Sequence, residues 1–193
     1  MATFERGFKS WAERTALTLR RELGLSALDR LDPLKLAAYL DIKVCTPRQI
    51  PGLPKDVIEQ LLKEDPFGWS AVSLLVDGGG LLIYNPRKSE GRRASDITHE
   101  LAHFILDHKP TTIVVSHELE IGIRSFDAKQ EDEANWLAWC ILLPRDAVFD
   151  SLRRRMSVTA IATQHGVTEA LVSFRMRITG VQYQLRAARR RRA

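Results

Sequence analysis

Two histidines separated by three residues, with a glutamate directly after the first, most constrain what this chain can fold into. His99, Glu100 and His103 lie within residues 96–108, which read D-I-T-H-E-L-A-H-F-I-L-D-H. On an α-helix, residues four apart lie one turn above each other on the same face, so both imidazoles can reach one ion. Glu100 then stands beside the first imidazole, where its carboxylate can face a bound water. The spacing predicts a metal site on a helix.

The surrounding residues favour a helix independently of the histidines. Ser89 is a suitable N-cap, and Pro110 prevents the helix from continuing past residue 109. Apolar residues recur at helical spacing and form a stripe that can be buried, at Ile97, Leu101, Phe104 and Ile105. The alternative is an ordinary helix with one surface histidine and one buried histidine. The H-E-x-x-H pattern is typical of zinc peptidases. A third ligand elsewhere in the chain would favour the metal site over the ordinary helix.

The acidic start of the next predicted helix, residues 128–143, is the natural source of that ligand. A catalytic zinc ion takes three protein ligands and keeps one position open for water. Glu131 and Asn135 are four apart and share a face, so Asn135 can support a ligand from behind. Glu133 points about 160° away from Glu131. The helix dipole also favours acidic residues in a first turn, but we expect Glu131 to be the ligand in preference to Glu133.

The run E-D-E-A-N-W-L-A-W-C-I-L-L-P at residues 131–144, following T-H-E-L-A-H, resembles the ImmA/IrrE family of metallopeptidases. The resemblance extends over roughly residues 10–180 and is strongest over residues 84–144. It implies that Glu100 is the general base and that three residues bind zinc: His99, His103 and Glu131. The chain departs from the family's pattern at Trp136 and Trp139, where smaller or differently shaped residues are common.

The same resemblance implies a function, a zinc-dependent endopeptidase that cleaves a lambda-repressor-like helix-turn-helix repressor and so derepresses stress-response or mobile-element genes. Manganese or iron(II) could occupy the same ligands. The sequence does not choose an oxyanion donor among Tyr84, His108, His117 and Arg124. The alternative function is a non-enzymatic regulator that binds DNA or a repressor, as in a toxin–antitoxin-like pair, with a structural metal. The presence of Glu100 favours the enzyme, because a structural site needs no base.

Apolar periodicity predicts an α+β fold: a small, mostly antiparallel sheet packed on the two ligand-bearing helices, in a zincin-like arrangement. Helices are expected at residues 4–23, 33–40 and 54–63, and strands at residues 42–44, 69–76 and 81–84. The last two strands flank a glycine-rich turn and form a hairpin. Residues 111–115 are expected to form a short strand, and the rest of 109–126 a loop beside the active-site cleft.

Charge divides the chain into a predicted peptidase domain at residues 1–150 and a basic helical segment at 151–193. The second part holds ten arginines and one acidic residue. Residues 158–176 have the pattern of a helix-turn-helix, with Gly166 in the turn and Thr168 as a cap. Arg175, Arg177 and the arginine tail could contact DNA phosphates. The alternative is a helical support for the catalytic part that binds no nucleic acid.

The remaining composition concerns the cellular compartment. The two cysteines, Cys45 and Cys140, are far apart, which argues against a disulfide framework. No apolar run approaches membrane-spanning length, and residues 1–9 lack the apolar stretch of a signal peptide. We therefore expect a cytoplasmic protein.

Overall fold

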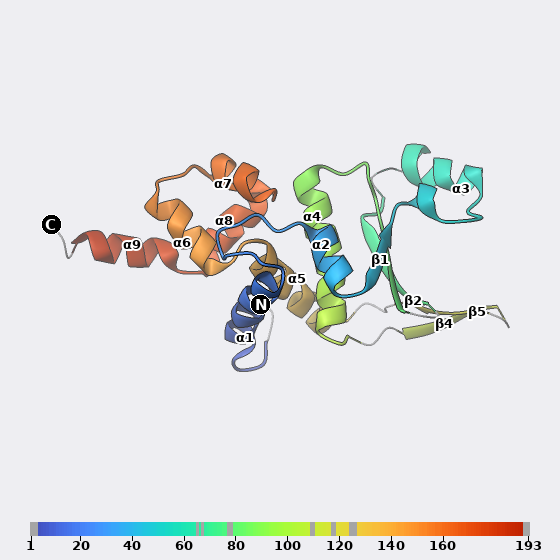
Figure 1. Cartoon of the computed structure of the whole chain (residues 1–193), viewed down its shortest axis with the longest axis horizontal. Helices are drawn as coiled ribbons and strands as arrows, with labels where there is room; N and C mark the ends of the chain where they lie inside the picture. The colour runs from blue at the N-terminus through green and yellow to red at the C-terminus, as the bar shows by residue number, and fades with distance from the viewer. Residues whose placement is uncertain are drawn as a thin grey trace.

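Strands gather at one end of the computed structural model, and helices form the rest (Figure 1). The structure describes residues 4–64, 66, 68–76, 79–108, 111–116, 119–123 and 127–190. The strands are β1 (Ile42–Cys45), β2 (Ala71–Val76), β3 (Gly79–Tyr84), β4 (Thr111–Ser116) and β5 (Leu119–Ile123). The helices that precede the metal motif are α1 (Phe8–Glu22), α2 (Pro33–Tyr39) and α3 (Lys55–Glu59), with a short 3-10 turn (Pro47–Gln49) before α3 and a π-helical turn (Gln60–Glu64) after it.

The five strands make one sheet in the order β1-β3-β2-β5-β4. β1 pairs with β3 in parallel, and every other pairing is antiparallel. The predicted α+β class with a mostly antiparallel sheet is therefore confirmed, as is the hairpin of β2 and β3. The prediction of a loop after residue 115 was wrong for β5, which pairs with both β4 and β2. Apolar residues alternate along β5 at positions 119, 121 and 123, which is the strand period of two.

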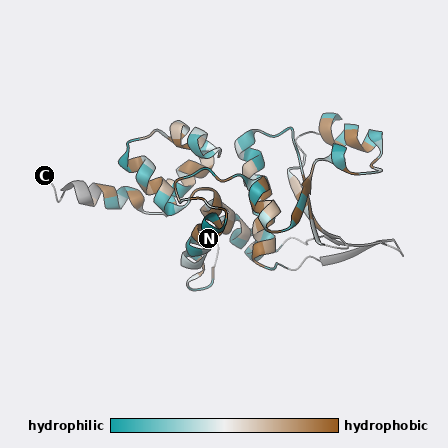
Figure 2. Cartoon of the chain, viewed as in Figure 1, coloured by the Kyte–Doolittle hydropathy of each residue, from teal (hydrophilic) through white to brown (hydrophobic). Residues whose placement is uncertain are grey.

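Helix α4 (Glu90–Ile105) carries the histidine motif and packs between the sheet and helix α5 (Ala128–Leu142). Hydrophobic residues recur among hydrophilic ones along α4, as in an amphipathic helix (Figure 2). Its buried face joins the core through Ala94, Ile97, Leu101 and Ala102. Helix α5 begins at Asp127, whose carboxylate accepts hydrogen bonds from the backbone N–H groups of Lys129 and Gln130 at 2.8 and 3.2 Å. This cap fixes where the first turn of α5, including Glu131, lies.

Four helices follow: α6 (Arg145–Arg153), α7 (Val158–His165), α8 (Glu169–Ile178) and α9 (Val181–Arg190). The predicted helix-turn-helix pattern is present in α7 and α8. Gly166 has a φ of +63° at the turn, and the Thr168 hydroxyl accepts from Leu171 N at 3.1 Å. A Cβ atom on Gly91 of α4 would lie 2.6 Å from the Val167 backbone, so this turn packs directly on the metal-motif helix. One hydrophobic core includes residues from both parts of the chain, and the domain division at residue 150 remains a prediction.

Two buried arginines hold the end of α5 in place. Arg20 of α1 and Arg175 of α8 are each fully buried. Their guanidinium groups donate to the carbonyls at the end of α5, which lack partners within the helix: Ile141, Leu142 and Leu143, at 2.9–3.0 Å. The prediction that Arg175 contacts phosphates was therefore wrong, because a guanidinium committed to buried carbonyls is not available to a ligand. Arg177 is exposed.

His165, at the end of α7, gives the fold a dependence on pH. Its side chain is 1% exposed, and burial, with a smaller effect of the Arg20 charge, lowers its pKa from 6.5 to about 4. The unfolded chain therefore binds a proton that the folded chain does not, between pH 6.5 and 4. Stability should fall by up to roughly 3 kcal/mol as the pH drops through this window. Urea unfolding at pH 7 and pH 5 measures this, and a His165→Gln variant with the same pH slope would contradict it.

Among the described residues, no helix combines the length and the apolar character that crossing a lipid bilayer requires.

Candidate metal centre

Three side chains from two helices converge beside the sheet. His99 and His103 come from α4 and Glu131 from α5, and their ligand atoms all lie within 4.8 Å of one another. The Nε2 atoms of His99 and His103 are 3.2 Å apart. The Glu131 carboxylate oxygens lie 3.2 Å from His99 Nε2 and 3.3 Å from His103 Nε2. The structure thus brings together the three residues expected to be ligands, His99, His103 and Glu131, hereafter called the metal cluster.

The spacing of these atoms is compatible with a metal ion. Zinc binds imidazole nitrogen and carboxylate oxygen at about 2.0–2.2 Å in tetrahedral geometry, which places neighbouring ligand atoms roughly 3.3 Å apart. The three separations are 3.2–3.3 Å, with one Glu131 oxygen facing each histidine. With one ligand atom taken from each residue, the three atoms lie within 4.8 Å of one another. His103 is 2% exposed, whereas the Glu131 side chain is 30% exposed. The cluster is therefore anchored on one side and open toward a cleft on the other, so it can hold a metal ion.

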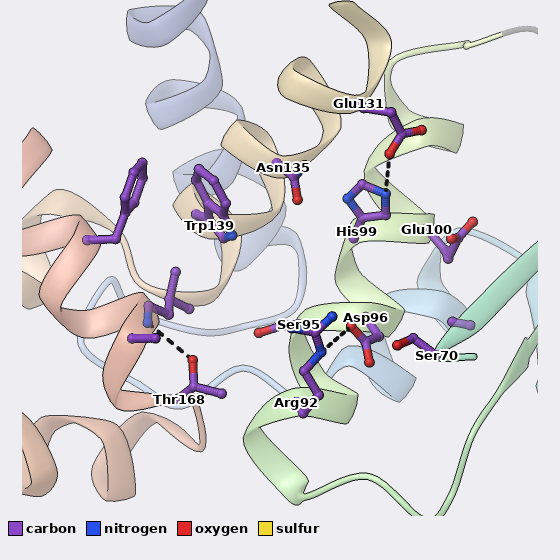
Figure 3. Close-up of a pocket in the computed structure, with 14 residues that line it drawn as sticks. Ser70, Arg92, Ser95, Asp96, His99, Glu100, Glu131, Asn135, Trp139 and Thr168 are labelled. Atoms are coloured by element: carbon purple, nitrogen blue, oxygen red, sulfur yellow. Dashed lines mark hydrogen bonds and ion pairs between the residues drawn. The ribbon is translucent and has the colours of Figure 1, made fainter. Parts of the chain in front are cut away.

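Glu100 lies beside this cluster and faces the sheet (Figure 3). Its carboxylate accepts a hydrogen bond from the Ser73 hydroxyl of β2. Both Glu100 and the ligand pair His99 and Glu131 line one cleft, which also includes Asn135 and Trp139 of α5 and the start of α8. Ser73 holds the Glu100 carboxylate in a fixed place next to the metal cluster. Asn135 lies one helical turn from Glu131 and lines the same cleft. Its role in supporting a ligand remains a prediction.

This constellation can be compared with known proteins. The model of the Peptidase_M78 family, described as the IrrE N-terminal-like domain, matches residues 56–177, well over half of the chain. The chain belongs to this family. The match covers both helices of the metal cluster and also α6, α7 and most of α8. No match was found among the curated proteins.

A solved structure supports the fold assignment. A Mycobacterium tuberculosis transcriptional regulator shares 18% sequence identity with this chain at a TM-score of 0.51. The similarity covers 90% of this chain and 47% of that protein, so the chain spans about half the length of its structural relative. At this level of identity the likeness concerns the fold alone.

A chain of partly buried hydrogen bonds leads away from His103. His103 Nδ1 lies 2.9 Å from His108 Nδ1, and His108 Nε2 lies 3.3 Å from a Glu133 carboxylate oxygen. If His103 Nε2 binds a metal, the proton of the ring is on Nδ1, and this N–H group donates a hydrogen bond to His108 Nδ1. His108 Nε2 then carries a proton of its own and donates to Glu133. With one tautomer of each ring, every donor in this hydrogen-bond chain meets an acceptor. The hydrogen bonds therefore orient His103 toward the metal cluster.

The hydrogen-bond chain shows different contacts for Glu131 and Glu133, the two residues of α5 that were compared as the third metal ligand. Glu131 meets the histidines of the motif, and Glu133 meets His108. His108 is one of the candidate oxyanion donors, and the structure places its ring between His103 and Glu133. Of the other candidates, Tyr84 ends β3, and His117 and Arg124 lie outside the described residues. Ser73 was not foreseen, because nothing near it in sequence marks it as a neighbour of Glu100.

Replacing Glu133 with glutamine should weaken metal binding by about 10–100-fold, the usual effect of removing a hydrogen-bond partner of a ligating histidine. The amide presents an N–H group as readily as its oxygen, so it no longer fixes the His108 tautomer. Competition with a chromophoric zinc chelator measures the affinity. Asp132→Asn is the matched control, because Asp132 is exposed on the same turn of α5. Equal affinities of the two variants would show that the hydrogen-bond chain does not support the site.

Proposed function

We propose that this protein is a zinc-dependent endopeptidase whose substrate is a helix-turn-helix transcriptional repressor. The observation that carries the proposal is the metal-ligand spacing of His99, His103 and Glu131 beside a positioned Glu100. Two imidazoles and one carboxylate are a ligand set of catalytic zinc, and a neighbouring carboxylate that is not one of the ligands supplies a base. Membership of a peptidase family supports the same reaction class.

The chemistry divides between the ion and the chain's own residues. His99, His103 and Glu131 would hold a zinc ion, which when bound would lower the pKa of a water at its open position and polarise the carbonyl of the scissile peptide bond. Glu100, held by Ser73, accepts the proton of the attacking water and passes it to the nitrogen of the leaving amine. The hydrogen-bond chain from His103 to Glu133 keeps the imidazole in one orientation during these transfers. The reaction consumes one water molecule and needs no other co-reactant.

The sheet offers a place for an extended substrate. Ser70 and Ala71, where β2 begins, line the same cleft as Glu100. A peptide in this cleft therefore lies beside the start of β2, and an extended backbone can bind there without regard to its sequence.

The proposed substrate class rests on the resemblance to ImmA/IrrE peptidases and is tested directly. The protein is incubated with zinc or manganese and with purified helix-turn-helix repressors encoded beside its gene, and the products are analysed by mass spectrometry. We expect two fragments whose masses together exceed that of the repressor by one water, and no fragments after treatment with a chelator. Intact repressors in the presence of metal-loaded protein would contradict the proposal and favour a regulator that binds without cutting.

A further inference from the structure

A second cavity lies next to the metal cleft, between α1, α5 and α8. Its volume is about 780 Å³, and its walls include Phe4, Trp136, Trp139 and Phe174. Trp139 and Phe174 also line the metal cleft, so the two spaces meet at this pair of rings. The catalytic steps described above use none of these aromatic residues.

The rings form a continuous apolar wall. Trp139 and Phe174 have centroids 4.4 Å apart, and Phe174 also meets Trp136 edge-on at 6.3 Å. Phe4 meets the other side of Trp136 at 5.1 Å. These four aromatic rings give the cavity a wall that suits a large apolar side chain.

The charges around the cavity favour an acidic ligand. Lys9 Nζ lies 4.4 Å from the centroid of the Trp136 ring, and the Arg177 guanidinium lies 5.3 Å from that of Phe174. Of the two acidic lining residues, Glu13 is already bound to the buried Arg175 at 2.6 Å. Asp132 alone opposes the exposed cations. An apolar group flanked by a carboxylate therefore matches this cavity better than a basic group does.

The geometry of α5 sets the distance between this wall and the metal cluster. Glu131, Asn135 and Trp139 follow one another at four-residue intervals and all face the cleft (Figure 3). Eight residues of α-helix rise about 12 Å. An extended peptide advances roughly 3.3 Å per residue. A substrate whose scissile bond lies at the metal cluster therefore reaches Trp139 three or four residues away from that bond.

We infer that Trp139 and Phe174 form a specificity subsite for a large apolar side chain of the protein substrate, three or four residues from the cleaved bond. An acidic residue next to that side chain faces Lys9 and Arg177. The inference rests on the proposed peptidase function. Trp139 and Phe174 thus determine specificity in this inference, because their rings contact the substrate at a distance from the reacting atoms.

The position of the preference is tested by cleavage of a proteome-derived peptide library, with sequencing of the products. The wild type should enrich large apolar residues at the third or fourth position on one side of the cleaved bond, with acidic neighbours. Phe174→Ala should lose this enrichment and reduce kcat/KM for apolar-containing peptides about tenfold or more, through KM rather than kcat. Tyr183→Ala is the matched control, since Tyr183 is 78% exposed and lines neither cavity. Cleavage without any preference at these positions would overturn the inference while leaving the peptidase function intact.

A binding measurement keeps the test independent of catalysis. The probe acetyl-Glu-Phe-amide is titrated against the protein's tryptophan fluorescence, with acetyl-Lys-Phe-amide as the charge-reversed probe. The acidic probe should bind more tightly, and Lys9→Glu, a change at an exposed residue, should remove or reverse that difference. Tight binding of both probes alike, or none, overturns the subsite. Probe binding by a protein that cuts no peptide would instead refute the peptidase function alone.

Discussion

Replacing Glu100 with glutamine is expected to lower kcat/KM for substrate cleavage by about 10²–10⁴-fold, the range of a lost general base. Glutamine has nearly the same shape, but its amide cannot accept the proton of the attacking water. Glu100 is not one of the three converging ligands, so zinc content should remain at the wild-type level. Activity is followed on the substrate identified by mass spectrometry, and zinc is measured on the same samples by elemental analysis.

Glu90→Gln provides the matched control for this change. Glu90 lies at the exposed start of the same helix and pairs with Arg30. The substitution removes the same charge from α4 without touching the metal cluster, so activity should stay within a few-fold of the wild type. If the Glu100 variant cut its substrate as fast as this control, the proton would have to be accepted elsewhere.

Replacing Glu131 with alanine is expected to weaken zinc binding on the order of 10³-fold, beyond the 10–100-fold effect of an outer hydrogen-bond partner. The variant keeps two neutral imidazoles and loses the one anionic ligand among the residues that converge there. Chelator competition measures the loss, and activity should disappear with the metal. The Glu133→Gln variant sets the scale, because that residue lies two positions along the same helix. A Glu131 variant with the smaller loss of the two would remove Glu131 from the ligand set.

The sequence predicted the metal cluster because its constraints are local to two helices. The four-residue spacing of His99 and His103 fixes their common face whatever the rest of the chain does. The helical angle between Glu131 and Glu133 lets only one of them face the metal, and Asn135 on the face of Glu131, together with the family resemblance, favoured Glu131. Ser89 marked the start of α4, which begins at Glu90, but the helix ends at Ile105, four residues before the limit that Pro110 set. The predicted helix at residues 128–143 agrees with α5 at Ala128–Leu142. Each of these inferences depends on residues that lie close together along one helix.

Contacts between distant segments could not be read in the same way. Ser73 reaches Glu100 only because the register of β2 sets it beside α4, and the two residues are 27 positions apart. Arg20 reads as an ordinary polar residue of an amphipathic helix, yet it binds a carbonyl 121 positions away. Arg175 was assigned to phosphates on charge alone, and only its burial shows the error. Pairwise proximity of this kind depends on tertiary packing, to which local spacing gives no access.

The most direct test of this account is a crystal structure of the zinc-loaded protein, with anomalous diffraction recorded on both sides of the zinc absorption edge. The account predicts one zinc peak about 2.0–2.2 Å from His99 Nε2, His103 Nε2 and a Glu131 oxygen, with the fourth position facing the cleft beside Glu100. The absence of a peak at these three residues, or a fourth protein ligand closing the site, would contradict it.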